Sequence, residues 1–212
     1  MKIKELASWM TTALKNDAIK GVGVDVAEIC IDEFFDNKGL IADIPVLGII
    51  FGIYQAGVSI KDRIFVGKLL AFVIRLSELE LQDRLDMVER LENEPEYANK
   101  VGERIIEMLD RVDSYKKPKM VAVVFSAYAR KEIDYETLCR LNGAIDKLPL
   151  YDMKYLRQFI NASPDERSKM SDVILNGFLM AGLVGAASAW GGLVYSPTSL
   201  CDTFIRLNID QQ

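Results

Sequence analysis

The strongest constraint on how this chain folds is a long stretch without charge near its C-terminus. No Asp, Glu, Lys or Arg occurs from Val173 to Cys201. A run of roughly 20 mainly apolar residues is long enough to cross a bilayer as one helix. The glycines and prolines inside this stretch favour another structure, a helix followed by a β-hairpin and a closing helix. That choice decides whether this part packs on protein or enters a membrane, and it specifies no reaction.

Two adjacent glycines predict the hairpin. Gly191 and Gly192 supply the positive φ angles that a tight two-residue turn needs. We therefore expect strands over residues 184–190 and 193–196, on either side of this pair. A hairpin in this position would carry no charged side chain.

Helices are predicted on both sides of the hairpin. Ser163 and Pro164 are typical of a helix start, because a serine hydroxyl accepts a backbone N–H and proline fits the first turn. Gly182 is placed to end that helix in the left-handed conformation. Pro197 separates the second strand from the closing helix. Helix, hairpin and helix in this order are typical of a winged-helix-like module, which we place at residues 149–212.

A membrane-spanning helix over residues 173–195 stays open as an alternative. The segment is long enough, and transmembrane helices tolerate glycine better than soluble helices do. Asn176, the glycine pair and the step from Ser196 to Pro197 argue against it. The absence of a basic cluster beside the segment also argues against it.

The remainder of the chain, residues 1–148, is predicted to form a helical body. Apolar residues recur there at intervals of three and four, the spacing of amphipathic helices. Pro118 and Asp134 mark helix starts, and Pro149 breaks the last helix of this part. The predicted fold class is therefore mainly α, a multi-helix bundle with one C-terminal β-hairpin.

A second uncharged run covers residues 44–60. Gly48 and Gly52 lie at near-helical spacing, where small residues let another helix approach closely. The run is marginal in length for a membrane span, so we interpret it as a core or interfacial helix. The candidate interaction residues are Gly48, Phe51 and Gly52 in this run, with Trp190 and Tyr195 in the hairpin.

Composition excludes several kinds of site. The chain has no histidine, the commonest general base and metal ligand, so a Ser–His or Cys–His nucleophile cannot form within it. Cys30, Cys139 and Cys201 are far apart, and we interpret them as small buried residues in a reducing cytoplasm. Asp110 and Asp113 lie among Lys and Arg and are interpreted as solvated surface. We predict no catalytic, cofactor-binding or metal-binding residue.

Charge argues against a nucleic-acid partner. The formal net charge is −5, whereas phosphate backbones are bound by Lys and Arg. The helix expected to face a DNA groove offers Arg167, Lys169 and Asn176, and the predicted wing is uncharged. A winged-helix DNA-binding regulator is therefore kept only as a further alternative.

Several stretches resemble a group of small, uncharacterised helical bacterial and phage proteins. They are Asp62 to Leu70, Val101 to Asp113, parts of residues 127–146, Leu179 to Val184, and Tyr195 to Thr198. These stretches carry packing patterns, so the resemblance implies no catalytic residue. It implies an association with phage–host conflict.

We therefore predict a non-enzymatic interaction or regulatory protein, cytoplasmic, that acts through protein–protein contacts and oligomerisation. Its expected partner is another protein or a second copy of itself, and no cofactor is expected. The first alternative is a membrane-active helical protein that inserts residues 44–60 and 173–195. The second is the winged-helix DNA-binding regulator.

Overall fold

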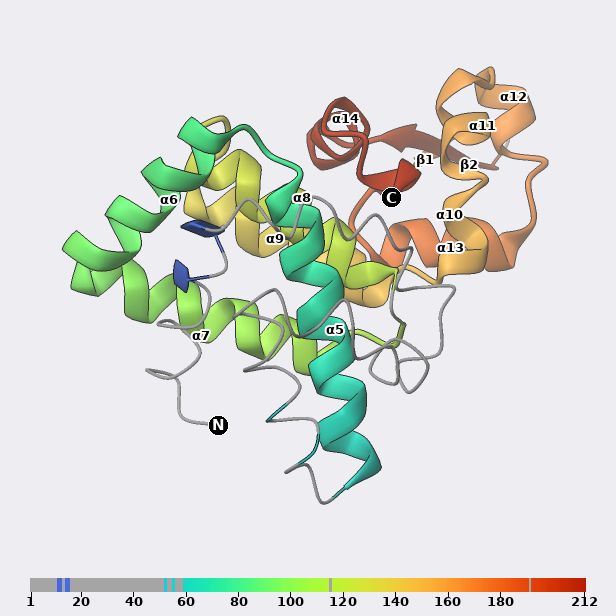
Figure 1. Ribbon diagram of the computed structural model, residues 1–212. Coiled ribbons are helices and arrows are strands. Elements are labelled where there is room, and N and C mark those ends of the chain that lie inside the picture. Colours follow the sequence, from blue (N-terminus) through green and yellow to red (C-terminus); the bar gives the residue numbers. More distant parts are fainter. Residues whose placement is uncertain are drawn as a thin grey trace. The chain divides into compact units, whose positions relative to one another are not determined.

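The computed structural model describes residues 59–114, 116–190 and 192–212, with Thr11, Thr12, Leu14, Lys15, Gly52 and Gln55 from the earlier part of the chain. Cys30, Gly48 and Phe51 lie outside the described residues. The structure divides into two compact units, Met1–Arg130 and Lys131–Gln212 (Figure 1). Each unit is treated by itself below.

The prediction of a mainly α fold with a C-terminal hairpin is confirmed. The first unit contains α5 (Ile60–Ser77), α6 (Leu81–Asn93), α7 (Pro95–Arg111) and α8 (Lys117–Ala129). The second contains α9 (Tyr135–Lys147), α10 (Leu150–Met153), α11 (Leu156–Asn161), α12 (Pro164–Arg167), α13 (Asp172–Met180) and α14 (Ser199–Arg206). Its antiparallel hairpin consists of β1 (Val184–Ala189) and β2 (Gly192–Pro197), and a short 3-10 helix, η2 (Ile209–Gln211), follows α14.

Two neighbouring helices, α5 and α8, form the centre of the first unit. α5 begins where the Ser59 hydroxyl accepts a hydrogen bond from Asp62 N at 3.2 Å. Most of both helices is buried, as expected of helices that are apolar on nearly all sides. They pack along each other, and the rings of Phe72 and Phe125 lie 6.1 Å apart.

Two buried lysines join α5 and α8 to the end of α7. Lys68 donates to the carbonyl oxygen of Asp110 at 3.2 Å, and Lys117 Nζ lies 2.8 Å from Asp113 Oδ1. Only 8% of Lys68 and 1% of Lys117 is exposed. The carbonyl end of a helix stabilises cations, which favours this arrangement. Both aspartates are exposed, as predicted.

Aromatic side chains from α11, α13 and α14 form the centre of the second unit. Phe159, Phe178 and Phe204 are each 0% exposed, and the first two rings meet edge to face at 5.7 Å. α9 packs on α13 and α14. The module predicted over residues 149–212 lies entirely within this unit, which also contains α9.

Helix ends lie where local sequence signals placed them. Asp134 accepts a hydrogen bond from Thr137 N at 2.8 Å at the start of α9. Ser163 and Glu166 cap each other's backbone groups at the start of α12. Gly182 follows α13 with a φ of 73°, the left-handed conformation expected of it.

One predicted helix is divided. The helix expected from Ser163 to Gly182 is α12 followed, after a turn, by α13. Arg167 explains the break, because its Nε donates to Phe159 O and its Nη2 donates to Ile160 O, both at 2.9 Å. These bonds hold the end of α12 against α11 before the chain enters α13.

The predicted hairpin is present, but its turn lies one residue earlier than expected. The register pairs Ala189 with Gly192, so Trp190 lies in the turn and Gly192 begins β2. Gly192 has a φ of 138°, a conformation that side-chain-bearing residues rarely adopt. Either glycine of the pair suits a turn, so the sequence alone does not fix the register.

Candidate interaction surface

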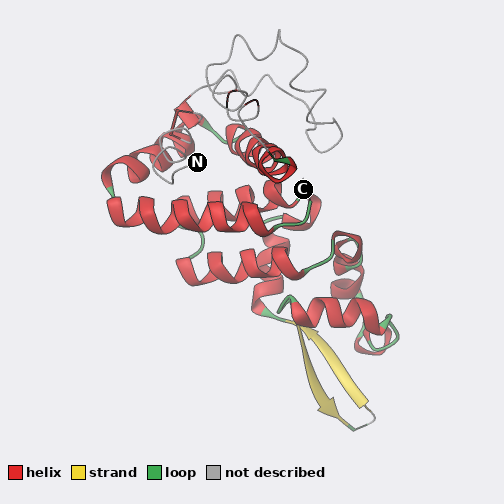
Figure 2. Cartoon of the chain, turned by 90° about the horizontal axis from the view of Figure 1, so that it is seen from below, coloured by secondary structure: helices red, strands yellow, loops and turns green. Residues whose placement is uncertain are grey.

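The hairpin projects beyond the helices of its own unit (Figure 2). At its base Leu183 is 0% exposed and Val184 is 4% exposed. From Ala186 to Ala189 every β1 residue is exposed, and Trp190 in the turn reaches 106%. The hairpin is therefore fixed at its base and uncovered at its end.

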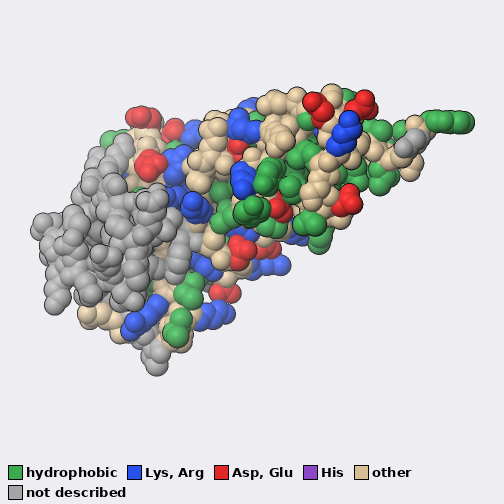
Figure 3. All heavy atoms as spheres, turned by 90° about the vertical axis from the view of Figure 1, so that its right-hand side faces the viewer, with side chains coloured by type: hydrophobic (Ala, Val, Ile, Leu, Met, Phe, Trp, Pro, Cys, Tyr) green, Lys and Arg blue, Asp and Glu red, His purple; other side chains and the backbone are tan. Residues whose placement is uncertain are grey.

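Apolar side chains gather at the uncovered end. Leu193 is 52% exposed and Val194 is 38% exposed, next to the turn that holds Trp190. Figure 3 shows hydrophobic side chains, in green, at the tip of the projection. Single exposed apolar residues are normal, whereas large contiguous apolar patches are typical of interaction sites. Much of the uncharged stretch thus lies on the outside of the fold.

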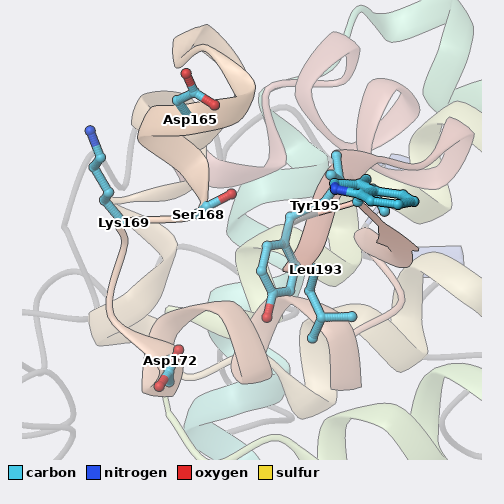
Figure 4. A pocket seen from close by; sticks show the side chains of 10 residues that line it. Asp165, Ser168, Lys169, Asp172, Leu193 and Tyr195 are labelled. Carbon is cyan, nitrogen blue, oxygen red and sulfur yellow. The ribbon is translucent and has the colours of Figure 1, made fainter.

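A cleft of about 640 Å³ runs between the hairpin and the α12–α13 connection. Figure 4 shows Leu193 and Tyr195 on the hairpin side, and Asp165, Lys169 and Asp172 on the helical side. Leu193 and Tyr195 are two residues apart in β2, so they share one face of the hairpin. The Lys169 ammonium points away from Tyr195. The cleft is thus walled by apolar groups on one side and by mostly acidic groups on the other.

This cleft lacks the cations that a phosphate backbone requires. Its charged residues are two carboxylates, Asp165 and Asp172, and one lysine, Lys169. Arg167, which the sequence suggested for a DNA groove, donates instead to the backbone of α11. α13 carries no Lys or Arg. Binding of a phosphate backbone in this cleft would therefore lack its main driving force.

A second cleft, of about 820 Å³, lies between α9 and α14. Its α9 wall presents Arg140, Gly143, Ala144 and Lys147, which share one face of the helix. A Cβ added at Gly143 would meet no atom within 4 Å. Met180, which also lines the cleft, is 71% exposed. The sequence analysis missed this cleft, although two small residues between two cations at helical spacing were an available signal.

The candidate interaction residues fall into two groups. Trp190 and Tyr195 come together, because both line the cleft beside the hairpin. Gly52 is exposed, and a Cβ there would meet no atom within 4 Å, so the described part of the chain shows no close helix contact at this glycine. Gly48 and Phe51 lie outside the described residues. A contact of Gly52 with another chain stays a prediction.

The described residues contain no metal-binding cluster, and the thiol of Cys201 is buried. No group of three or more Cys, Asp or Glu among them could hold a metal ion. Cys201 is 0% exposed, and burial raises the pKa of its thiol to about 12. The nucleophilic thiolate therefore does not form at neutral pH. Cys201 is the small buried residue that the sequence predicted, whereas Cys139, also expected to be buried, is only half-buried.

Within the described ranges, no helix combines the length and the apolar character that crossing a bilayer requires. Residues 173–195 form α13, β1 and most of β2, with a turn between the strands. The continuous helical span considered for this segment is therefore wrong. Most of residues 44–60, the other segment considered for insertion, lies outside the described residues.

Comparisons with protein-family models, curated proteins and solved structures found no match. The resemblance to helical bacterial and phage proteins therefore stays a prediction. The function is argued from the hairpin and the clefts.

Proposed function

We propose that this chain is a non-enzymatic interaction protein whose hairpin docks onto another protein molecule. Trp190 carries the proposal, because this residue is 106% exposed and lies in the turn of a hairpin that projects beyond its unit. Trp and Tyr are enriched among the residues that dominate protein–protein binding. The uncharged surface from Ala186 to Tyr195 also suits the core of an interface, where charged residues are depleted.

The anchored base of the hairpin supports a docking role. Thr198 N donates to Leu183 O at 3.0 Å, which closes the base, and Leu183 is buried in the core of its unit. An element that is ordered before binding loses less conformational entropy when it binds. The exposed end can therefore present Trp190 in a defined position.

The carboxylates beside the hairpin have a structural explanation that involves no catalysis. Asp165 lies in the first turn of α12 and Asp172 in the first turn of α13. Negative side chains stabilise this end of a helix. The absence of histidine from the whole chain removes the usual general base.

An aromatic photo-crosslinking amino acid at position 190, which keeps a ring in place of the indole, tests the docking role in cells. Tyr151, which is 70% exposed in α10, provides a matched exposed aromatic position outside the hairpin. We expect a defined protein adduct from position 190 and none from position 151. Equal adducts from both positions, or none from either, would contradict docking by the hairpin.

Phage–host conflict is the process that the sequence resemblance suggests, and we retain it as part of the proposal. Plaque counts on cells that produce the wild type test it. Trp190→Ser, produced at the same level, should abolish any effect on infection, because it removes the docking side chain. A wild type that leaves infection unchanged across a panel of phages would contradict this process.

A membrane surface is a second candidate, favoured by the same indole. Trp is enriched at the interfaces of bilayers, and the hairpin has no charge that resists entry into them. Against this, only Lys169 among the residues that line the hairpin cleft could attract an anionic headgroup. Co-sedimentation with zwitterionic and anionic vesicles separates the candidates. Binding to both that disappears in Trp190→Ser would favour the membrane.

A further inference from the structure

In the described part of the chain, no strand pairs with the outer edge of β1. At the base of the hairpin Thr198 N donates to Leu183 O at 3.0 Å, so these two residues form a hydrogen-bonded pair. Hydrogen-bonded and non-hydrogen-bonded pairs alternate along an antiparallel ladder. The register therefore directs the N–H and C=O groups of Val184, Ala186 and Ser188 away from β2. Val184 is buried at the base of the hairpin, whereas Ala186 and Ser188 are exposed, so the groups of these two residues are accessible to a further strand.

β1 lacks the features that usually protect an edge strand. Natural edges carry charged residues, proline or a bulge. β1 has the sequence Val-Gly-Ala-Ala-Ser-Ala, and its register with β2 runs without a bulge. β1 adjoins α13, whereas β2 adjoins both α12 and α14 and ends at Pro197. Of the two strands, β1 is therefore the better candidate to accept a further strand.

We propose that β1 pairs antiparallel with β1 of a second copy of this chain, so that two hairpins form a four-stranded sheet about a two-fold axis. This inference rests on the proposed docking role of the hairpin and names the molecule that docks there. A hairpin on its own is marginally stable in water, whereas sheets of three or more strands are stable. Pairing would therefore stabilise the part of the hairpin that projects.

Charge favours a second copy as the occupant of this edge. The chain carries a net charge of −5, which makes two copies repel over much of their surface. The hairpin carries no charge, so no like charges face each other when β1 meets itself. An acidic or basic partner would find no complementary charge on β1. A two-fold interface uses the same patch twice, and an antiparallel strand edge meets this condition.

The direction of the free backbone groups restricts the register. Two registers pair most of one β1 strand with the other. The two-fold axis passes Ala186 in the first and Ala187 in the second, and the small side chains there let the two strands approach closely. Trp190 of each copy then lies opposite Gly182 or Val184 of the other, at the base of that copy's hairpin. The pairing thus covers the indole that a single chain leaves exposed.

Adding one charge to either strand tests the pairing by sedimentation velocity. Ser188→Lys places a charge on the β1 edge, the device by which natural edge strands avoid pairing. Ser196→Lys places the same charge on β2 and is the matched control. We expect the wild type and Ser196→Lys to sediment as dimers and Ser188→Lys as a monomer. A monomeric wild type, or equal dissociation by both substitutions, would overturn the proposal.

Cysteine substitutions test the same geometry without added charge, in case Ser188→Lys does not fold. Ala186→Cys and Ala187→Cys each place two thiols at the axis in one of the two registers. Ser196→Cys keeps its thiols on the outer strands, and the wild type, in which Cys201 is buried and Cys139 is half-buried, provides the background level. We expect a disulfide-linked dimer from at least one β1 variant and none from Ser196→Cys. Equal yields on both strands, or none on β1, would show that the strands do not pair.

Failure of this inference and failure of the docking role give different results. If the wild type is a monomer but position 190 still forms an adduct with a different protein, the docking role holds and the proposed pairing of two β1 strands is wrong. If the wild type is a monomer and position 190 forms no adduct, both are wrong.

Discussion

Thr198 binds Gly182 across the base of the hairpin, where its Oγ1 donates to the glycine carbonyl oxygen at 2.8 Å. The same hydroxyl accepts a hydrogen bond from Cys201 N at 3.2 Å and so caps α14. Gly182, with a φ of 73°, turns the chain from α13 towards β1. One side chain therefore joins the end of α13, the base of the hairpin and the start of α14.

Replacing this hydroxyl should destabilise the second unit. Thr198→Val keeps the shape of the side chain but removes both hydrogen bonds, so we expect it to lower the free energy of unfolding by about 1–2 kcal/mol. Thr198→Ser keeps the hydroxyl and should remain close to the wild type. Urea denaturation measures both variants. If the Val and Ser variants lost the same free energy of unfolding, the hydroxyl would contribute little to stability.

Two helical glycines should respond to alanine in opposite directions. At Gly143 the new Cβ meets open space, so Gly143→Ala should stabilise the protein by about 0.5–1 kcal/mol through helix propensity. At Gly177 the new Cβ would lie 3.1 Å from Oδ2 of Asp152, which is 8% exposed. Gly177→Ala should therefore destabilise by about 1 kcal/mol or more. If both alanine variants shifted the urea midpoint in the same direction, the expected crowding of the new Cβ at Gly177 would be contradicted.

Arg167 should matter for stability and not for binding to DNA. Its guanidinium donates to Phe159 O and Ile160 O and lies 5.1 Å from the centre of the Phe159 ring. Arg167→Ala should lower the free energy of unfolding by about 1–3 kcal/mol. Lys169→Ala, at an exposed neighbour, should change it by less than about 0.5 kcal/mol. Sequence-selective DNA binding that both substitutions abolish would contradict this assignment.

The cap of α9 should weaken in acid. Hydrogen bonds from Thr137 hold the pKa of Asp134 below its ordinary value of 3.8. A carboxylate with a lowered pKa stabilises the fold above its ordinary pKa, and this contribution is lost as the pH falls through the lower value in the folded state. Below pH 3.8 the wild type should therefore lose stability more steeply than Asp134→Asn, which caps the helix without titrating. If the free energy of unfolding fell equally with pH in the two proteins, protonation of Asp134 would not be the cause of the loss.

The features that the sequence predicted correctly depend on residues close to one another along the chain. Ser163 and Glu166 cap one helix across three positions, and Gly182 ends another by its own conformation. The hairpin follows from the glycine pair. Its register was missed by one residue because Gly191 and Gly192 are equally suited to a turn.

The features that the sequence did not predict depend on contacts between distant elements. The division between α12 and α13 depends on the bonds of Arg167 to α11, and these bonds are set by tertiary packing. The cleft between α9 and α14 needs the packing of two helices that are far apart in the chain. Trp190 and Tyr195 were selected as interaction residues, but only the folded hairpin shows that both line one cleft.

The short bridge at the base of the hairpin has a consequence for how such a chain can change. Since Thr198 N and Leu183 O are 3.0 Å apart, the chain leaves and rejoins the helical unit at nearly the same point. Strands of other lengths or sequences could fill the segment between these residues while α13 and α14 keep their positions. Residues 184–197 thus form an appendage whose length and sequence can change while the helical unit keeps its fold.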